Sequence, residues 1–119
     1  MKEYDIQKAL VKILDSKGVL YNCSAGGMRT GIRTAVKMKA SGYKRGMPDI
    51  AIYEPRGQYH GLFIEVKTLK GTASPHQKQF IKDLQDRGYR AEIVKGLHNC
   101  VGLINEYFSV DDNRESMVK

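Results

Sequence analysis

Three charged residues stand at the ends of two apolar segments that are expected to form a hairpin. Asp49 opens the first segment, 50–52, while Glu65 and Lys67 interrupt the end of the second, 62–67. Side chains alternate across a strand, so Glu65 and Lys67 share one face. With the turn centred near Gln58, antiparallel pairing puts Asp49 opposite Lys67. The same register puts Ala51 opposite Glu65. We therefore expect two carboxylates and an ammonium at one end of the hairpin.

This set of groups suits metal-assisted chemistry on a phosphodiester. Two carboxylates that close repel each other unless a cation lies between them, and hard oxygen ligands suit Mg²⁺ or Mn²⁺. Lys67 would hold or help deprotonate a metal-bound water and offset phosphate charge, as attack of water on a phosphodiester requires. The alternative is structural: Asp49 as a turn residue after Pro48, and Glu65 with Lys67 as a weak ion pair at a strand edge. The set as a whole favours the metal site.

The elements around this hairpin predict a single domain over residues 1–108, followed by a polar tail, 109–119. Apolar spacing predicts helices over 2–17, from Ser74 to Gly88, and over 97–108, and strands over 19–23 and 90–95. A basic, glycine-rich insertion at 24–45 separates the first strand from the hairpin. The order α-β-β-β-α-β-α favours an α/β fold with a mixed central sheet flanked by helices.

The motifs resemble a known nuclease family. Pro48-Asp49 followed by Glu65-Val66-Lys67 resembles the PD-(D/E)xK nuclease superfamily. The segments "GMPDI", "FIEVK", "SPHQKQF" and "GYRAEIVKG" resemble more specifically the VRR-NUC (virus-type replication-repair nuclease) family in its small stand-alone form. The resemblance extends over residues 1 to about 105. It implies a restriction-endonuclease-like sheet and a Mg²⁺ or Mn²⁺ cofactor.

The resemblance also implies roles for individual residues. Asp49 and Glu65 match the metal-binding acids, and Lys67 matches the catalytic lysine. The Val66 carbonyl would face the metal. Gln77 matches a glutamine that family members keep near the site on the following helix.

Two of the implied roles have structural alternatives. Gln77 lies on the stripe of Ile81 and Leu84, which supports an inward orientation, but a glutamine there is otherwise a solvated or capping residue. Glu3 resembles the acid of the N-terminal helix that completes the metal shell in many such nucleases. Its alternative is an acid favourably placed at a helix N-terminus.

The charge balance favours a polyanionic partner. Lys and Arg number 20 against 13 Asp and Glu, a net charge of +7. The insertion holds six cations and no acid, and Lys70, Lys78 and Lys82 follow the hairpin. We expect the following residues to contact the phosphate backbone of DNA, the alternative being a solvated basic face: Arg29, Arg33, Lys37, Lys39, Lys44, Arg45, Lys70 and Lys78.

Other classes of protein are disfavoured. Cys23 and Cys100 form no CxxC pair and, with three scattered histidines, no zinc spacing. No apolar run approaches the ~20 residues that cross a bilayer, and the N-terminus does not resemble a signal peptide. These features predict a cytoplasmic protein with no membrane partner.

The leading hypothesis is therefore a metal-dependent endonuclease for branched or structured DNA, which the resemblance implies is a homodimer similar to Holliday-junction resolvases. The alternatives are a non-catalytic DNA-binding module on the same fold and a flap or single-strand nuclease. A site-specific restriction-type enzyme has little room for a target-reading domain. Apolar side chains in and beside the insertion would form part of the dimer interface: Tyr21, Met28, Ile32, Val36, Met38 and Tyr43.

Overall fold

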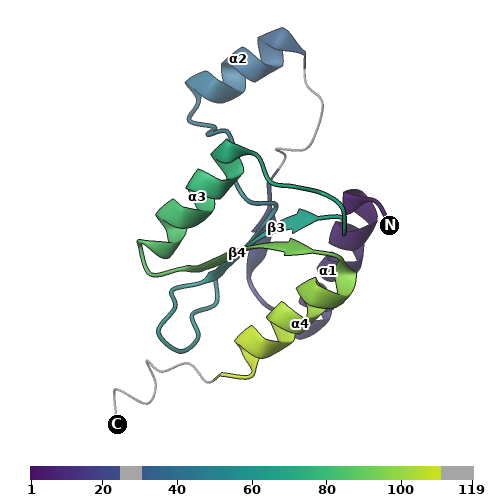
Figure 1. Ribbon diagram of the computed structural model, residues 1–119. Helices are drawn as coiled ribbons and strands as arrows, with labels where there is room; N and C mark the ends of the chain where they lie inside the picture. The colour runs from purple at the N-terminus through teal and green to yellow at the C-terminus, as the bar shows by residue number, and fades with distance from the viewer. Residues whose placement is uncertain (25–30, 111–119) are drawn as a thin grey trace.

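The computed structural model describes residues 1–24 and 31–110 (Figure 1). In chain order its elements are α1 (Glu3–Lys17), β1 (Tyr21–Cys23), α2 (Ile32–Ala40), β2 (Ile50–Ile52), β3 (Leu62–Lys67), α3 (Pro75–Gln85), β4 (Arg90–Lys95) and α4 (Leu97–Phe108). In the part of the chain that is described, no helix is both long and apolar enough to cross a membrane.

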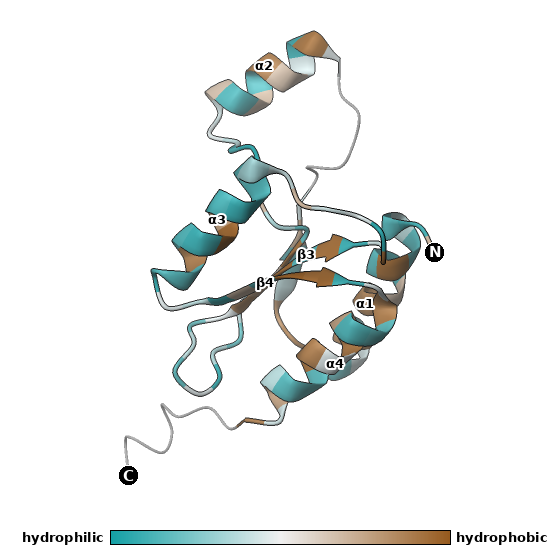
Figure 2. Cartoon of the chain, viewed as in Figure 1, coloured by the Kyte–Doolittle hydropathy of each residue, from teal (hydrophilic) through white to brown (hydrophobic). Residues whose placement is uncertain are grey.

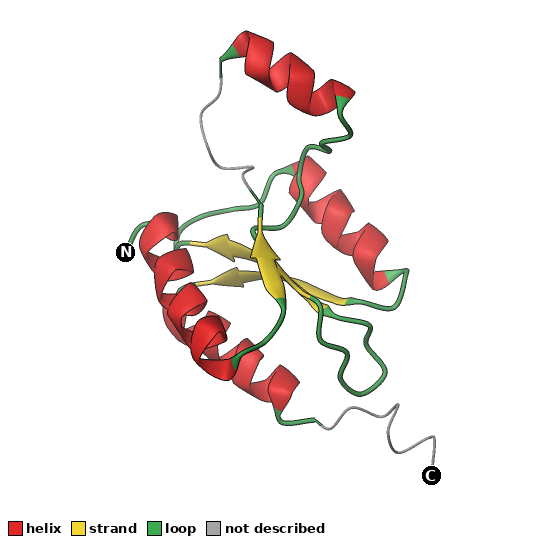
Figure 3. Ribbon diagram, turned by 180° about the vertical axis from the view of Figure 1, so that it is seen from behind, coloured by secondary structure: helices red, strands yellow, loops and turns green. Residues whose placement is uncertain are grey.

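The strands form one mixed sheet in the order β1-β2-β3-β4. β1 and β3 each pair with β2 in antiparallel orientation, whereas β3 and β4 are parallel. Parallel neighbours need a crossover connection, and α3 provides it. α3 covers one face of the sheet, and α1 and α4 cover the other (Figures 1 and 3). The predicted mixed sheet flanked by helices is therefore confirmed.

The core lies on both faces of β3. Leu62, Ile64 and Val66 pack against the apolar stripes of α1 and α4, while Phe63 packs with Ile81 of α3. Figure 2 shows the apolar residues gathered on the strands and on the helix surfaces that face them. All six positions of β3 are buried, including Glu65 and Lys67. A strand enclosed by two helical layers therefore carries two charged side chains into the interior.

Helix boundaries follow their local signals. α1 buries Ile6, Leu10 and Leu14, which recur every four residues, and it ends at Gly18, whose φ of 66° belongs to the left-handed region. α3 begins at Ser74, whose hydroxyl accepts the backbone N–H of Gln77 at 3.2 Å. Some ends differ from the prediction: α3 stops at Gln85 rather than Gly88, and β1 covers only Tyr21–Cys23.

The hairpin register differs from the predicted one by two residues. Ala51 pairs with Phe63, not with Glu65. The turn lies earlier than Gln58 suggested, because Gly57 adopts a φ of 56° and Arg56 pairs with Tyr59. An even shift leaves every side chain on its predicted face. Continuing the pairing by one residue brings Asp49 beside Glu65 instead of Lys67, so the two carboxylates are closer than expected.

The basic insertion contains a helix that sequence analysis missed. α2 spans nine residues, Ile32–Ala40, and buries none of them. A helix without a core-facing side shows no long apolar stripe, and glycines surround this one in the sequence. It stands off from the sheet beyond the N-terminal end of α3 (Figure 1). The element order is therefore α-β-α-β-β-α-β-α.

Candidate metal centre

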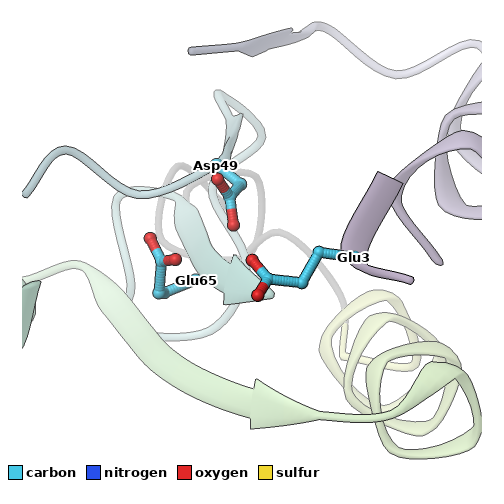
Figure 4. Close-up of side chains that lie close together, drawn as sticks. All are labelled: Glu3, Asp49 and Glu65. Atoms are coloured by element: carbon cyan, nitrogen blue, oxygen red, sulfur yellow. The ribbon is translucent and has the colours of Figure 1, made fainter. Parts of the chain in front are cut away.

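Three carboxylates from three separate segments meet near the carboxyl end of β3. Glu3 comes from the first turn of α1, Asp49 directly precedes β2, and Glu65 lies on β3. One oxygen from each lies within 4.8 Å of the other two, and the three side chains approach a common space (Figure 4). In the described ranges this is the one group of three acidic, histidine or cysteine side chains close enough to share a metal ion.

Asp49 is held in place through its backbone and its side chain. Its carbonyl accepts the N–H of Ser24 at 2.9 Å, which extends the pairing of β1 with β2. Its Oδ2 accepts the N–H of Val66 at 2.9 Å, across from β3. The side chain therefore takes the place of a backbone acceptor at the end of the hairpin. This contact orients the carboxylate beside Glu65.

Glu65 is the most deeply buried of the three acids, at 2% exposed. Its Oε2 accepts a hydrogen bond from Nε2 of Gln77 at 3.2 Å and forms an ion pair with Nζ of Lys67 at 3.3 Å. Its Oε1 is buried and has no hydrogen-bond partner. Burial, and next the charge of Asp49, raise the pKa of Glu65 to about 8, against the opposing effect of Lys67.

This donor set fits a hard divalent cation. Buried carboxylate oxygens are stable as anions only when paired or when they coordinate a metal. Lys67 alone does not neutralise the pair of acids, since Asp49 adds a second negative charge beside Glu65. A cation among Glu3, Asp49 and Glu65 would supply the partner that Oε1 of Glu65 lacks, with oxygen ligands that suit Mg²⁺ or Mn²⁺.

Lys67 lies at the end of β3 and is 8% exposed. Its backbone is fixed by β4, where Lys67 pairs with Lys95, and by the Gly96 N–H, which donates to the Lys67 carbonyl at 2.8 Å. The ammonium therefore lies beside the acid cluster on a rigid strand. Val66 is fully buried, and its described part in the site is the N–H bond to Asp49. Its carbonyl as a metal ligand stays a prediction.

Gln77 combines the two contacts that sequence analysis treated as alternatives. Its Oε1 accepts the backbone N–H of Ser74 at 2.9 Å and completes a capping box at the start of α3. Its Nε2 donates to Glu65. One side chain therefore ties the first turn of α3 to the most buried acid of the cluster.

Gly46 is a positioning residue that sequence analysis did not single out. Its φ is 91°, and a Cβ added there would lie 2.5 Å from the carbonyl oxygen of His76. The chain leading to Asp49 therefore passes directly over the start of α3, at the level of Gln77. The glycine of "GMPDI" was the available signal, because such a close backbone approach leaves no room for a side chain.

The basic residues predicted to bind DNA are spread over several segments. Arg33, Lys37 and Lys39 lie on α2, and Lys44 and Arg45 follow it before β2. Lys70 follows β3 and Lys78 lies on α3; all seven are exposed. Arg29 lies outside the described residues, as does Met28 of the expected interface.

Comparison with known proteins agrees with the fold and with the motifs. A model of the VRR-NUC domain family matches residues 1–97. A solved structure described as a VRR_NUC domain protein is 31% identical, with a TM-score of 0.80 over 94% of this chain and 92% of the other. A second, described as a VRR_NUC domain, supports the fold alone, being 24% identical with a TM-score of 0.63 over 90% of this chain and 98% of the other.

No curated protein matches the sequence. The family match nevertheless covers the three acids, Lys67 and Gln77, and the solved structures share the same arrangement of sheet and helices. The resemblance found in the sequence is thereby confirmed, and this chain belongs to the VRR-NUC domain family, a family of nuclease-type domains.

Proposed function

We propose that this protein is a Mg²⁺- or Mn²⁺-dependent endonuclease that hydrolyses phosphodiester bonds in branched or otherwise structured DNA, in the manner of a Holliday-junction resolvase. The observation that carries the proposal is the acid cluster around Glu65, whose buried Oε1 lacks a partner while Lys67 lies beside it. A purely structural ion pair would need neither Asp49 nor Glu3 at this point.

In this proposal Asp49 and Glu65 would hold the metal, Glu3 would complete the carboxylate set, and the Val66 carbonyl would add a further oxygen. When bound, the ion acts as a Lewis acid toward the phosphate and lowers the pKa of a water. Lys67 would hold or help deprotonate the attacking water and would offset phosphate charge. Gln77 positions Glu65 through the contact from its Nε2.

The exposed cations would hold the DNA backbone on either side of the centre. α2 carries Arg33 and Lys37 one turn apart, on a helix that the rest of the described chain does not bury. Lys78 directly follows Gln77 near the start of α3, and Lys70 lies beyond the end of β3. Binding through phosphates would be largely independent of sequence.

A homodimer would supply the second site needed to cut two strands of a junction. Ile32 and Val36 on α2 are 85% and 62% exposed, which is unusual for one short helix unless something covers them. Closed two-fold symmetry is the commonest way to pair such surfaces. Light scattering at micromolar concentration is expected to give twice the chain mass of 13.4 kDa. A monomer that still makes paired nicks in four-way junctions would exclude this arrangement.

The decisive experiment is a cleavage panel. Duplex, single-stranded, flap and four-way DNA are incubated with the protein and Mg²⁺ or Mn²⁺, with EDTA and the Asp49→Asn variant as controls. We expect the branched substrates to be cut and both controls to be inactive. DNA binding without cleavage on every substrate would favour the non-catalytic module. Cleavage confined to flaps or single strands would favour the flap or single-strand nuclease.

A further inference from the structure

An apolar groove of about 430 Å³ opens at the carboxyl ends of β3 and β4. Met1 and Ile6 form one wall, the loop 68–70 after β3 forms another, and Gly96 and Leu97 at the start of α4 form the third. Its volume lies within the ~300–1,000 Å³ that is typical of small-ligand sites. In sheets with helices on both faces, this edge is the usual place for a ligand.

The groove and the metal centre are built from the same segments. Glu3 lies between Met1 and Ile6 in the first turn of α1. Lys67 directly precedes the loop 68–70, and its carbonyl accepts the N–H of Gly96. The groove and the acid cluster therefore share the first turn of α1 and the end of β3, so a ligand in the groove would lie near whatever occupies the acid cluster.

The walls combine exposed apolar groups with a cation. Leu69 and Met1 are 73% and 71% exposed, although each faces a hollow that a ligand could fill. Leu69 lies close over the start of α4, since a Cβ on Gly96 would come within 2.7 Å of its Cδ2. Lys70 stands at the rim and is exposed. The groove thus offers apolar contact inside and a positive charge at its edge.

We propose that this groove receives the unstacked base and sugar of a nucleotide adjacent to the scissile phosphate, with Lys70 on the neighbouring phosphate. The inference rests on the proposed function and deepens it. A nucleotide matches the groove because its base presents apolar faces while its phosphate is anionic. In a continuous duplex that base would first have to leave the stack at a cost of a few kcal/mol, whereas an unpaired nucleotide is already free. Among branched substrates, those whose nucleotides at the branch point are unpaired or easily unpaired are therefore favoured.

The test uses the full chain with Asp49→Asn, so that binding is measured without cleavage. The fluorescent base 2-aminopurine is placed in turn at each nucleotide around the branch point of a flap substrate. At one position we expect its fluorescence to change on binding, because the base leaves its stacked neighbours. Adding Leu69→Ala should remove that signal and weaken binding of the flap by about tenfold, as expected when one leucine side chain no longer packs on the base. Leu69→Met, which keeps an apolar side chain of similar size, should retain both.

The matched control is Leu20→Ala, which removes a leucine that is 66% exposed and does not line the groove. It should leave flap binding and the fluorescence unchanged. Binding of flap DNA without a fluorescence change at any position would overturn the inference while leaving the nuclease proposal intact. An equal effect of Leu69→Ala on continuous duplex would also overturn it. If the wild type is a dimer and Leu69→Ala is a monomer, a second copy covers the groove, and the inference would be overturned. A wild-type protein that binds no DNA would overturn both proposals.

Discussion

β3 and α2 both carry charged residues among apolar ones, yet β3 is buried and α2 is exposed. On β3 every position is buried, and the charges of Glu65 and Lys67 meet each other and Gln77 within the same chain. On α2 no position is buried, and Arg33 and Lys37 remain exposed. Charge pattern alone therefore does not distinguish a built site from a surface. What distinguishes them is whether helices pack over the segment and bury its charged side chains.

The difference indicates which kind of partner each region binds. Burying a charged group is costly unless the group is paired. On β3 the buried Oε1 of Glu65 has no hydrogen-bond partner, and a metal ion would supply a partner. A nine-residue helix is marginal on its own in water, and α2 has no core contact to stabilise it. α2 therefore has the features of a surface that a larger partner would cover and stabilise. Mutations in β3 should therefore affect chemistry, and those in α2 should affect binding.

The largest effect is expected from the metal-binding acids. Asp49→Asn and Glu65→Gln should each lower the cleavage rate more than a hundredfold, since the loss of even an outer partner of a ligand costs 10–100-fold. DNA binding should change little, because the phosphate-binding cations remain. Cleavage rates, DNA affinity and calorimetric titration with Mn²⁺ measure the three quantities. Full activity of both variants, or of the wild type in EDTA, would exclude the metal mechanism.

Lys67→Ala is expected to lower turnover by about a hundredfold, which is typical for the loss of one group that stabilises the transition state. Mn²⁺ and DNA should still bind. Lys95→Ala is the matched control, because Lys95 pairs with Lys67 across the sheet but is exposed. If the Lys67→Ala protein cleaves normally and only its melting temperature falls, Lys67 forms a structural ion pair with Glu65 and takes no part in cleavage.

Gln77→Ala should weaken Mn²⁺ binding by about 10–100-fold through the loss of its bond to Glu65. Ser74→Ala separates this effect from helix capping: it removes the other half of the capping box at a cost of about 1 kcal/mol in stability but leaves Glu65 untouched. Calorimetry and thermal melting of both variants decide the matter. Equal Mn²⁺ affinities in the two would assign Gln77 to capping alone.

Neutralising α2 should change affinity without changing chemistry. Arg33→Ala with Lys37→Ala is expected to weaken binding to all DNA sequences about equally. It should also reduce the slope of log affinity against log salt by up to about 1.8, that is ~0.9 for each phosphate that the protein no longer neutralises. Lys8→Ala with Lys12→Ala is the control, since these two lysines have the same spacing and are exposed on α1. If the salt dependence of binding is the same in both double variants, α2 is not part of the DNA-binding surface.

The smallest effect concerns the stability of the metal-free protein. The pKa of Glu65 is raised in the folded state to about 8 from an ordinary value of 4.5, so the folded state keeps a proton that the unfolded chain releases. Its contribution to stability is full below about pH 4.5 and is lost as pH rises toward 8.

Glu65→Gln should therefore melt a few °C higher than wild type at pH 8 without metal, at about 4 °C per kcal/mol. Mn²⁺ should raise the melting temperature of the wild type only. A variant that melts lower at pH 8 would mean that the ion pair with Lys67 outweighs the burial of the charge.

The sequence by itself determined which residues share a face. The alternation of the hairpin strands put Glu65 and Lys67 on one face with Asp49, because such periodicities are local properties of a strand. They survive an even shift of register, so the faces were right although Asp49 was paired with the wrong residue. The family motifs added Gln77 through its place after Ser74.

Only the tertiary structure decided how these groups meet. The register depends on the turn at Gly57, and the unpartnered oxygen of Glu65 depends on three segments packing around it. The helix α2 offers only a short apolar pair, Ile32 and Val36, because none of its residues is buried against a core. The groove beside Leu69 exists because β3 and β4 end side by side under the start of α1. Such features arise from contacts between residues far apart in the chain, and no local spacing encodes them.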